Sequence, residues 1–386
     1  MSLLKKQGFQ FFIFFGIFAL IAGIAHAEVS AETQYVFNTF LFLVCGFLVM
    51  FMAAGFAMLE AGSVRSKNAA AICVKNISLY STAGLLYWLV GYNLMYGVDE
   101  GGFLGSMSVW TADDMAVGGE APDYSGGYAS GSDWYFQMVF CATTASIVSG
   151  TIAERLKIWP FLIFTLVLTG FIYPIVGSWE WGGGFLDANF AFSDFAGSTL
   201  VHSTGGWAAL AGAIVIGSRT GRFNDDGSVT SFPGSSIPLA TLGAFILWLG
   251  WFGFNGGSQL ALGSALDSVA ISNIFINTNL AAAAGVMFAM ITSQILFGKV
   301  DIVTALNGAI GGLVAITAEP LAPSIGAAVF IGGVGGILVA LSTPLLLKMK
   351  IDDVVGAIPA HLVCGIWGTM IVPLTNGDAS YFGQFM

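Results

Sequence analysis

The sequence predicts an all-α protein that crosses a membrane many times. Hydrophobic residues make up 56% of the 386 positions and charged residues only 9%, whereas a soluble domain has about 25% charged residues. The apolar residues fall into runs near the roughly 20 residues that a transmembrane helix needs. The net charge of −10 comes mostly from acidic residues in connecting segments, so it does not indicate a nucleic-acid partner.

The N-terminus has the pattern of a secretory signal peptide. Two lysines precede an apolar run, and A-H-A follows directly before Glu28 as an A-x-A cleavage site. We therefore expect a signal peptide over 1–27 and a membrane domain over 28–386, with the mature N-terminus outside the cytoplasm. The alternative is an uncleaved first helix.

Hydropathy predicts ten spanning helices after this segment. They begin near Tyr35, Asn68, Asp133, Trp159, Gly197, Ile237, Ala270, Asp301, Ile325 and Gly356. Two of the twelve basic residues lie in the predicted signal peptide, and nine of the other ten follow odd-numbered spans; the exception is Lys75, in the second span. By the positive-inside rule these nine mark the cytoplasmic side. We expect a multi-pass protein of the inner (plasma) membrane.

Two histidines lie inside apolar, glycine-rich spans. His202 is in the fifth span, eight residues past Asp194, and His361 is in the tenth, eight past Asp353. At ~1.5 Å per residue, each lies roughly 12 Å into a core about 30 Å thick. An ionisable side chain at that depth is a candidate functional group. Either the two imidazoles contact each other, or each is bonded separately to a neighbouring carbonyl.

The separation of the histidines also predicts symmetry. The span of His361 is the fifth after that of His202, so their helices cross in opposite directions. This offset is expected of two five-helix inverted repeats around a central pore, with a site where the repeats meet. The glycine pairs Gly308/Gly312 and Gly332/Gly336 predict close helix packing.

Three aromatic residues and a serine are predicted on the outer side of His202. Phe140 lies in the third span, Trp181 just beyond the fourth, and Phe254 and Ser258 near the outer end of the sixth. Ring faces and a hydroxyl suit a small cation. The phenyl rings could instead form a hydrophobic gate, and tryptophan is common at membrane interfaces in any case.

Asp194 stands at the mouth of the helix that carries His202. We expect its carboxylate to cap that helix by accepting free N–H groups. The alternative role is to attract an incoming cation.

The sequence predicts neither a cofactor nor an enzymatic reaction. The four cysteines lie in apolar stretches without C-x-x-C spacing, so we expect packing residues rather than disulfides or metal ligands. A metalloenzyme built on the two histidines would need a third ligand at the same depth, and no Asp, Glu or Cys pair is suitably placed.

Seven ordered segments carry a resemblance to a known family. They are G-F-A-M-L-E-A-G-S-V-R-S-K-N (55–68), F-Q-M-V-F-C-A-T-T (136–144), A-E-R-L (153–156), W-G-G-G (181–184), D-F-A-G-S-T-L-V-H (194–202), W-F-G-F-N-G-G-S (251–258), and D-D to H-L-V-C-G-I-W-G (352–368). Over essentially all of its mature length the chain resembles the ammonium transporter (Amt/Mep/Rh) family, in its bacterial Amt branch.

The resemblance implies a pore. His202 and His361 match the family's twin histidines in a narrow apolar channel, and Phe140 and Phe254 match the stacked phenyl pair that closes it. It implies electrogenic uptake, in which ammonium is deprotonated, ammonia passes through, and the histidines relay the proton. The alternatives are an electroneutral NH3/CO2 gas channel of the Rh type and an ammonium sensor.

The resemblance also implies an entrance and an assembly. Trp181 and Ser258, with Phe140 beside them, match the external ammonium recruitment site, and Asp194 matches the family's essential aspartate below it. The family forms homotrimers in membrane lipid, with one pore per subunit.

Two departures from the family pattern carry expectations. The family's core has eleven helices followed by a tail that contacts PII regulatory proteins, and this chain ends at Met386, where the eleventh helix would begin. We therefore expect ten spans, the eleventh missing, and no PII regulation through a tail. Gly356 stands where some members have another aspartate, which predicts an altered inner vestibule.

Overall fold

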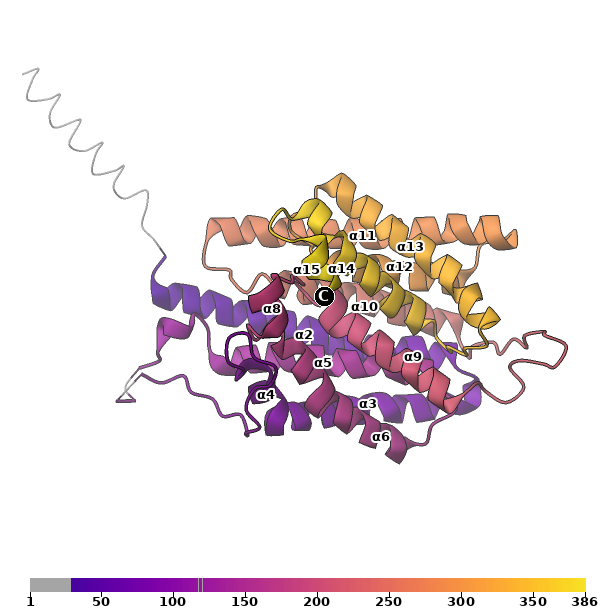
Figure 1. Ribbon diagram of the computed structural model, residues 1–386, viewed down its shortest axis with the longest axis horizontal. Coiled ribbons are helices and arrows are strands. Elements are labelled where there is room, and N and C mark those ends of the chain that lie inside the picture. The colour runs from indigo at the N-terminus through magenta and orange to yellow at the C-terminus, as the bar shows by residue number, and fades with distance from the viewer. Residues whose placement is uncertain (1–28, 117, 120) are drawn as a thin grey trace, which may run out of the picture.

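The computed structural model describes residues 29–386 except 117 and 120. The predicted signal peptide over 1–27 lies outside the described residues. Within them the regular structure consists of helices and two isolated bridges, and the long helices run roughly parallel as one bundle (Figure 1). The predicted all-α fold is confirmed.

Ten helical runs form the bundle within the described residues. They are α2 (Ala31–Ser63); η1 (Ser66–Asn68), α3 (Ala69–Leu86), η2 (Tyr87–Gly91) and α4 (Tyr92–Tyr96); α5 (Ser130–Thr151); α6 (Ile158–Val167), η4 (Leu168–Ile172) and α7 (Tyr173–Ser178); η5 (Ser198–Ser203) and α9 (Thr204–Ile216); α10 (Ile237–Gly257); α11 (Ala265–Phe297); α12 (Ile302–Thr317); α13 (Ile325–Lys348); and η6 (Ile358–Val363) and α14 (Cys364–Thr375). Short helices η3 (Tyr124–Gly126), α8 (Phe185–Phe190) and α15 (Tyr381–Phe385) lie in connections or at the C-terminus.

These runs begin close to the predicted starts, and the largest difference is at α11, which begins at Ala265 rather than near 270. In the described part of the chain, eight runs are long and apolar enough to cross a membrane. The other two are α12, which has 16 residues, and α5, which is rich in serine and threonine. The chain is thus a multi-pass membrane protein, and the count of ten spans stays a prediction.

Side-chain caps explain why several helices begin where they do. A serine or aspartate just before the helix accepts a free backbone N–H of the first turn, which would otherwise lack a partner. The capping residues are Ser30, Ser236, Ser264, Asp301 and Ser324. At α11 the cap is reciprocal, because Ser264 and Asp267 each accept from the other's backbone N–H.

Glycines allow α11, α12 and α13 to pack at backbone contact. A Cβ on Gly312 of α12 would lie 2.4 Å from the carbonyl oxygen of Ala281, and one on Gly336 of α13 would lie 2.1 Å from that of Gly285. The predicted close packing at these glycines is confirmed. Of the four cysteines, which were expected to be packing residues, Cys45, Cys141 and Cys364 are buried and Cys73 is exposed.

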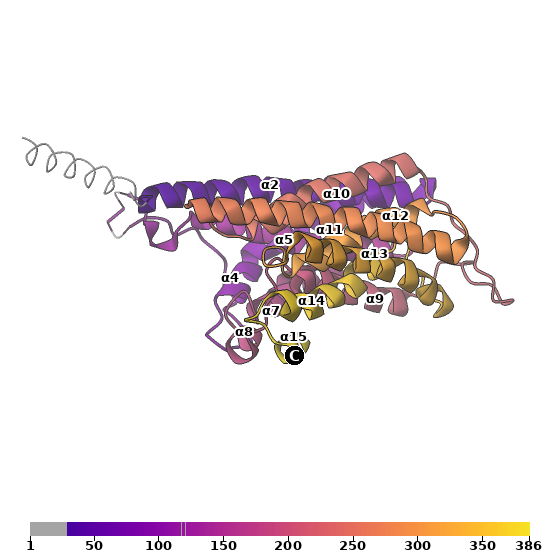
Figure 2. The same cartoon turned by 90° about the horizontal axis from the view of Figure 1, so that it is seen from above.

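The bundle has two chemically different ends. The connections after α2, α5 and α9 place Arg65, Arg155 and Arg219 together, and we call this the basic end. The opposite, acidic end carries the described parts of the connection from α4 to α5, which include Asp99, Asp113 and Asp123. Helices α2 and α10 run antiparallel between the ends, since Gly62 faces Ala240 near the basic end. They lie along one side of the bundle, with α9 and α14 toward the other (Figure 2).

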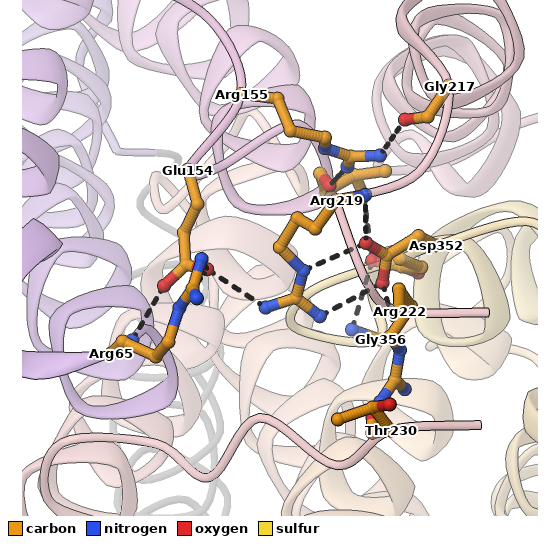
Figure 3. Close-up of polar contacts among 11 residues, drawn as sticks. Arg65, Glu154, Arg155, Gly217, Arg219, Arg222, Thr230, Asp352 and Gly356 are labelled. Atoms are coloured by element: carbon orange, nitrogen blue, oxygen red, sulfur yellow. Dashed lines mark hydrogen bonds and ion pairs between the residues drawn. The ribbon is translucent and has the colours of Figure 1, made fainter. Parts of the chain in front are cut away.

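An ion-pair cluster joins the connections at the basic end (Figure 3). The guanidinium of Arg219 donates two hydrogen bonds to Asp352, at 2.8 and 2.9 Å, and one to Glu154 at 3.2 Å. Arg65 reaches the same Glu154 carboxylate at 2.7 Å. The ring of Phe232 lies under both guanidinium groups, 4.5 Å from that of Arg65 and 5.0 Å from that of Arg219.

Glu154 occupies an unusual backbone position within this cluster. Its φ is +67°, a left-handed conformation that costs a non-glycine residue roughly 1 kcal/mol or more. Burial would raise the pKa of its carboxyl, but hydrogen bonds from Arg65 and Arg219 lower the pKa to about 2. The charged contacts therefore stabilise a strained turn between α5 and α6.

Candidate functional site

The structure brings His202 and His361 into direct contact at the centre of the bundle. Their Nδ1 atoms lie 3.2 Å apart, and the ring centroids are separated by 5.2 Å with 30° between the planes. Neither side chain is appreciably exposed, at 0% and 2%. One Nδ1 must donate and the other accept, so the two imidazoles share a proton position.

Each histidine is carried by a widened helical turn. His202 lies in η5, where its N–H bonds to the carbonyl of Gly197, five residues earlier, at 3.0 Å. His361 lies in the equivalent π turn η6. Such turns are rare and frequently occur at functional sites. The two helices are antiparallel, because a Cβ on Gly206 would meet Leu362 and one on Gly365 would meet Ser203.

A buried aspartate caps η5. Asp194 accepts the backbone N–H groups of Gly197 and Ser198 at 3.0 and 2.8 Å on one oxygen, and those of Thr199 and Leu200 at 2.7 and 2.9 Å on the other. Its side chain is fully buried, so it faces the helix rather than a solvent entrance. This arrangement satisfies all four free donors of a helix start.

Asp194 is itself held by two neighbours at the acidic end. Its carbonyl accepts the indole N–H of Trp181 at 2.8 Å, and its N–H donates to Glu180 at 3.1 Å. Burial, with the nearby Asp194, raises the pKa of Glu180 well above its ordinary value. The Glu180 carboxyl group thus holds the backbone of Asp194 from the acidic end.

A second aspartate caps η6 in the same way. Asp353 accepts the N–H groups of Gly356 and Ile358 at 3.1 and 2.7 Å, and the hydroxyl of Thr151 at 3.0 Å. Gly356 has φ +83°, and a Cβ there would lie 2.4 Å from the amide nitrogen of Asn307. Gly356 thus occupies a left-handed position, where an aspartate would be strained and would displace Asn307.

Aromatic rings extend from His202 toward the acidic end. The imidazole stacks against Trp251 and Phe254, with centroids 4.8 and 5.2 Å away. Phe254 stacks in turn on Phe140, at 4.0 Å and 26°. Both phenyl rings are fully buried, so their stack separates the histidines from the acidic end.

A chamber of about 340 Å3 lies beyond the phenyl stack. It is lined by Tyr92, Tyr96, Tyr128, Asp133, Phe136, Gln137, Phe140, Trp181, Phe195, Ser258 and Leu260. Three residues singled out from sequence, Trp181, Ser258 and Phe140, therefore meet at one chamber. Phe254 lies behind Phe140, and Asp194 lies behind Trp181.

Sequence reasoning missed most of this lining. Asp133, Phe136, Gln137 and Phe140 recur at i, i+3, i+4 and i+7, which places them on one face of α5. That spacing, with two polar residues inside an aromatic run, is the signal that could have found them. Asp133 is 6% exposed and accepts the hydroxyl of Tyr92, so the chamber contains a buried carboxyl group.

The space beside His361 toward the basic end is far smaller. It holds about 10 Å3 and is bounded by residues that include Phe56, Ile310 and Val355. A water molecule needs at least about 10–15 Å3. The histidine pair is therefore enclosed on both sides, by a phenyl stack and by a constriction.

Comparison with known proteins identifies the family. The sequence profile of the Ammonium Transporter Family matches residues 40–381. The chain belongs to this family. A putative ammonium transporter of Synechocystis sp. is 44% identical over 370 residues, 94% of this chain and 82% of that protein. Ammonium transporter Amt2 of Archaeoglobus fulgidus is 42% identical over 348 residues, 88% of this chain and 71% of that protein.

Solved structures of the ammonium transporter family share the fold. A protein described as "Sensor Amt Protein" is 36% identical, with a TM-score of 0.84 over 92% of this chain and 87% of that one. Mep2 of Candida albicans is 27% identical, with a TM-score of 0.78 over 92% of this chain and 76% of that one. Because the family consists of transporters, the chain is not an enzyme.

Proposed function

We propose that this protein transports ammonium across the membrane by separating it into ammonia and a proton. The observation that carries the proposal is the buried pair of imidazoles, with 3.2 Å between Nδ1 atoms, enclosed where an ion is poorly solvated. Curated relatives at 42–44% identity are named ammonium transporters, which supports the substrate.

The first step is recruitment of ammonium in the chamber at the acidic end. The ring of Trp181 lies at 6.0 Å from that of Phe140, edge to face, and aromatic faces attract small cations. Ser258 donates its hydroxyl to the carbonyl of Phe254 at 2.9 Å, which leaves its oxygen lone pairs for an ammonium N–H. The carboxyl of Asp133 lines the same chamber and offers oxygen acceptors for a cation.

The second step is loss of the proton. The stacked rings of Phe140 and Phe254 leave no polar partner for a cation, and removing an unpaired ammonium from water costs several kcal/mol or more. Neutral ammonia is far less penalised. Passage of the phenyl rings therefore selects ammonia, and the proton moves separately.

The third step is relay through the histidines. The Nε2 atom of His202 has no hydrogen-bond partner, so it can accept a proton while its Nδ1–H donates to His361. Transfer of that Nδ1 proton makes His361 cationic, and His361 then releases its Nε2 proton toward the basic end. One proton enters and one leaves. Each passage inverts both tautomers, so the rings must reorient before the next one.

The proposed setting follows from the charges at the two ends. The basic end, with Arg65, Arg155 and Arg219, would face the cytoplasm of a bacterial inner membrane, and the mature N-terminus would lie outside. Each subunit would consist of two five-helix inverted repeats. Three subunits, each with its own pore, would form a homotrimer. Native mass spectrometry tests the trimer, which should have three times the mass measured for the single mature chain.

A sensor is the second candidate function. One similar solved structure is described as "Sensor Amt Protein". In a sensor, ammonium would occupy the chamber and the histidine pair would carry little flux. Binding without transport in the same preparation would favour this function.

Current measurement on proteoliposomes tests the proposal. An ammonium gradient should produce a transient inward current on a solid-supported membrane, accompanied by uptake. Uptake without current would contradict the relay and favour a neutral gas channel of the Rh type. Binding with neither uptake nor current would favour the sensor.

A further inference from the structure

A second cavity lies at the basic end, apart from the histidine pair. It holds about 200 Å3 and lies between the start of α3 and the connection from α5 to α6. Its lining residues are Asn68, Ala71, Ile72, Lys75, Glu154, Arg155, Leu156 and Lys157. Helices α3 and α6 pack against each other along one edge of the bundle (Figure 1).

Two cationic side chains in this cavity have unused hydrogen-bond donors. Lys75 is 4% exposed, and its Nζ has no hydrogen-bond partner. The Nε of Arg155 is also buried without a partner. The other nitrogens of Arg155 donate to the carbonyls of Gly217 and Thr151, and the bond to Gly217 is visible in Figure 3. Buried donors of like charge at one cavity favour an anionic ligand.

The nearby carboxylates are already engaged. Glu154 is held by Arg65 and Arg219 (Figure 3). Glu60, deeper in the bundle, accepts from Ser149 and Asn76. The ammonium group of Lys75 instead lies 4.8 Å from the centre of the Phe161 ring, which attracts a cation but offers no hydrogen-bond acceptor. The positive charge at the cavity is therefore only partly compensated.

The surface beside the cavity is apolar. Val74 and Ile77 on α3 are 51% and 71% exposed, and Trp159 and Ile163 on α6 are 74% and 66% exposed. Exposed apolar residues of this kind on a spanning helix face lipid tails, and tryptophan is typical of the interface. A ligand with a charged head and apolar chains would match both the cavity and its rim.

We infer that this cavity binds a phosphate group through Lys75, Arg155 and Lys157, and that the phosphate belongs to the headgroup of an anionic phospholipid. Basic pockets between spanning helices on the cytoplasmic side bind such headgroups. The apolar rim favours a lipid over free phosphate, because only a lipid also covers Ile77 and Ile163. The inference is independent of the transport proposal.

Native mass spectrometry of the full chain in detergent tests the inference. Phosphatidylglycerol, zwitterionic phosphatidylcholine and inorganic phosphate are each titrated against the wild type, Lys75→Met and Lys157→Gln. Lys348→Gln is the matched control, because Lys348 is an exposed lysine at the end of α13 and does not line the cavity. Binding is read directly, so the result does not depend on transport activity.

We expect one phosphatidylglycerol site per chain to weaken roughly tenfold in Lys75→Met, because a charged hydrogen bond is lost. Lys157→Gln should weaken it less, and Lys348→Gln should leave it unchanged. Lys157 is exposed, so its variant tests the site even if Lys75→Met does not fold. Equal phosphatidylglycerol affinity in wild type and both cavity variants would overturn the inference. Lysine-dependent binding of inorganic phosphate without lipid discrimination would overturn the lipid assignment.

Discussion

The two halves of the histidine site share one arrangement, an aspartate cap followed by a π turn that carries a histidine. They differ in the space that lies beside each histidine. On the acidic side Asp194 caps η5, and His202 follows eight residues later; on the basic side Asp353 caps η6, and His361 follows at the same interval. Yet His202 faces a phenyl stack and a chamber of about 340 Å3. His361 faces a space of about 10 Å3.

The shared caps and π turns therefore have one role, and the unequal spaces beside the histidines have another. The matching caps and π turns hold both imidazoles at one depth and in contact, which a proton relay requires. The unequal surroundings differ in the room they leave for a cation, because the space on the basic side also has an aromatic ring and a carboxyl, Phe56 and Glu60, but holds only about 10 Å3 against about 340 Å3 on the acidic side. The feature to test is therefore the contrast between the shared caps and π turns and the unequal spaces beside the two histidines.

The largest expected effect is removal of the caps. Asp194→Ala leaves four buried N–H groups without an acceptor, and the loss should be at least about 3 kcal/mol of unfolding free energy. Asp353→Ala frees two N–H groups and one hydroxyl, so it should cost less. Thermal unfolding in detergent compares the two variants. A larger loss of unfolding free energy for Asp353→Ala than for Asp194→Ala would contradict the greater contribution expected of the Asp194 cap.

The next effect concerns the chamber. Asp133→Asn replaces a carboxyl that lines the same chamber as Trp181, so the ammonium concentration for half-maximal current should rise roughly tenfold, equivalent to about 1.4 kcal/mol. The maximal current should stay the same, because Asp133 does not contact the histidines. Asp113→Asn, at an acidic residue outside the chamber lining, serves as the control. Equal concentration dependence in both variants would remove Asp133 from recruitment.

A smaller effect tests the turn before His361. Gly356→Ala should lower the unfolding free energy by about 1 kcal/mol through strain at positive φ, with a further loss from displacing Asn307. In an Asn307→Ala background the loss of unfolding free energy that comes from displacing Asn307 should disappear. A double-mutant cycle should then show that the combined loss is smaller than the sum of the two single losses. Strictly additive effects on thermal unfolding would show that the two residues do not compete for space.

The smallest expected effect is a loss of stability in acid that is confined to the basic end. The pKa of Glu154 is about 2 in the folded protein, below its ordinary value of about 4.3. The Glu154 carboxylate therefore contributes its full share of folding stability above about pH 4.3, and this contribution is lost as the pH falls toward 2. Hydrogen exchange between about pH 5 and about pH 2.5 should show the 152–157 connection, which carries Glu154, opening before 194–200. The reverse order would contradict this difference between the halves.

Much of this architecture could be predicted from the sequence. Ile237 and Ile325 were expected as helix starts and are the first residues of α10 and α13, because a serine cap precedes an apolar run at both places. The equal spacing of each histidine from its aspartate predicted a common depth, and the structure places the two rings in contact. Depth alone could not decide whether the rings would meet.

The contact between the rings depends on features without a sequence signature. A π turn adds a residue to one turn and rotates the following side chains by about 100°, so the facing of His202 and His361 could not be derived from an ordinary helical register. Phe136 was indistinguishable from the other phenylalanines until α5 was placed. Asp133 was taken as the start of a span, although its spacing to Phe140 already put both on one face.

The relay itself is tested most directly by ammonium-evoked current on a solid-supported membrane for wild type, His202→Ala and His361→Ala. Equal amounts of folded, reconstituted protein are compared, with thermal unfolding as the check on folding. We predict that the current is lost in either variant, because a proton cannot cross the pair when one imidazole is missing. Unchanged current in both variants would contradict the account.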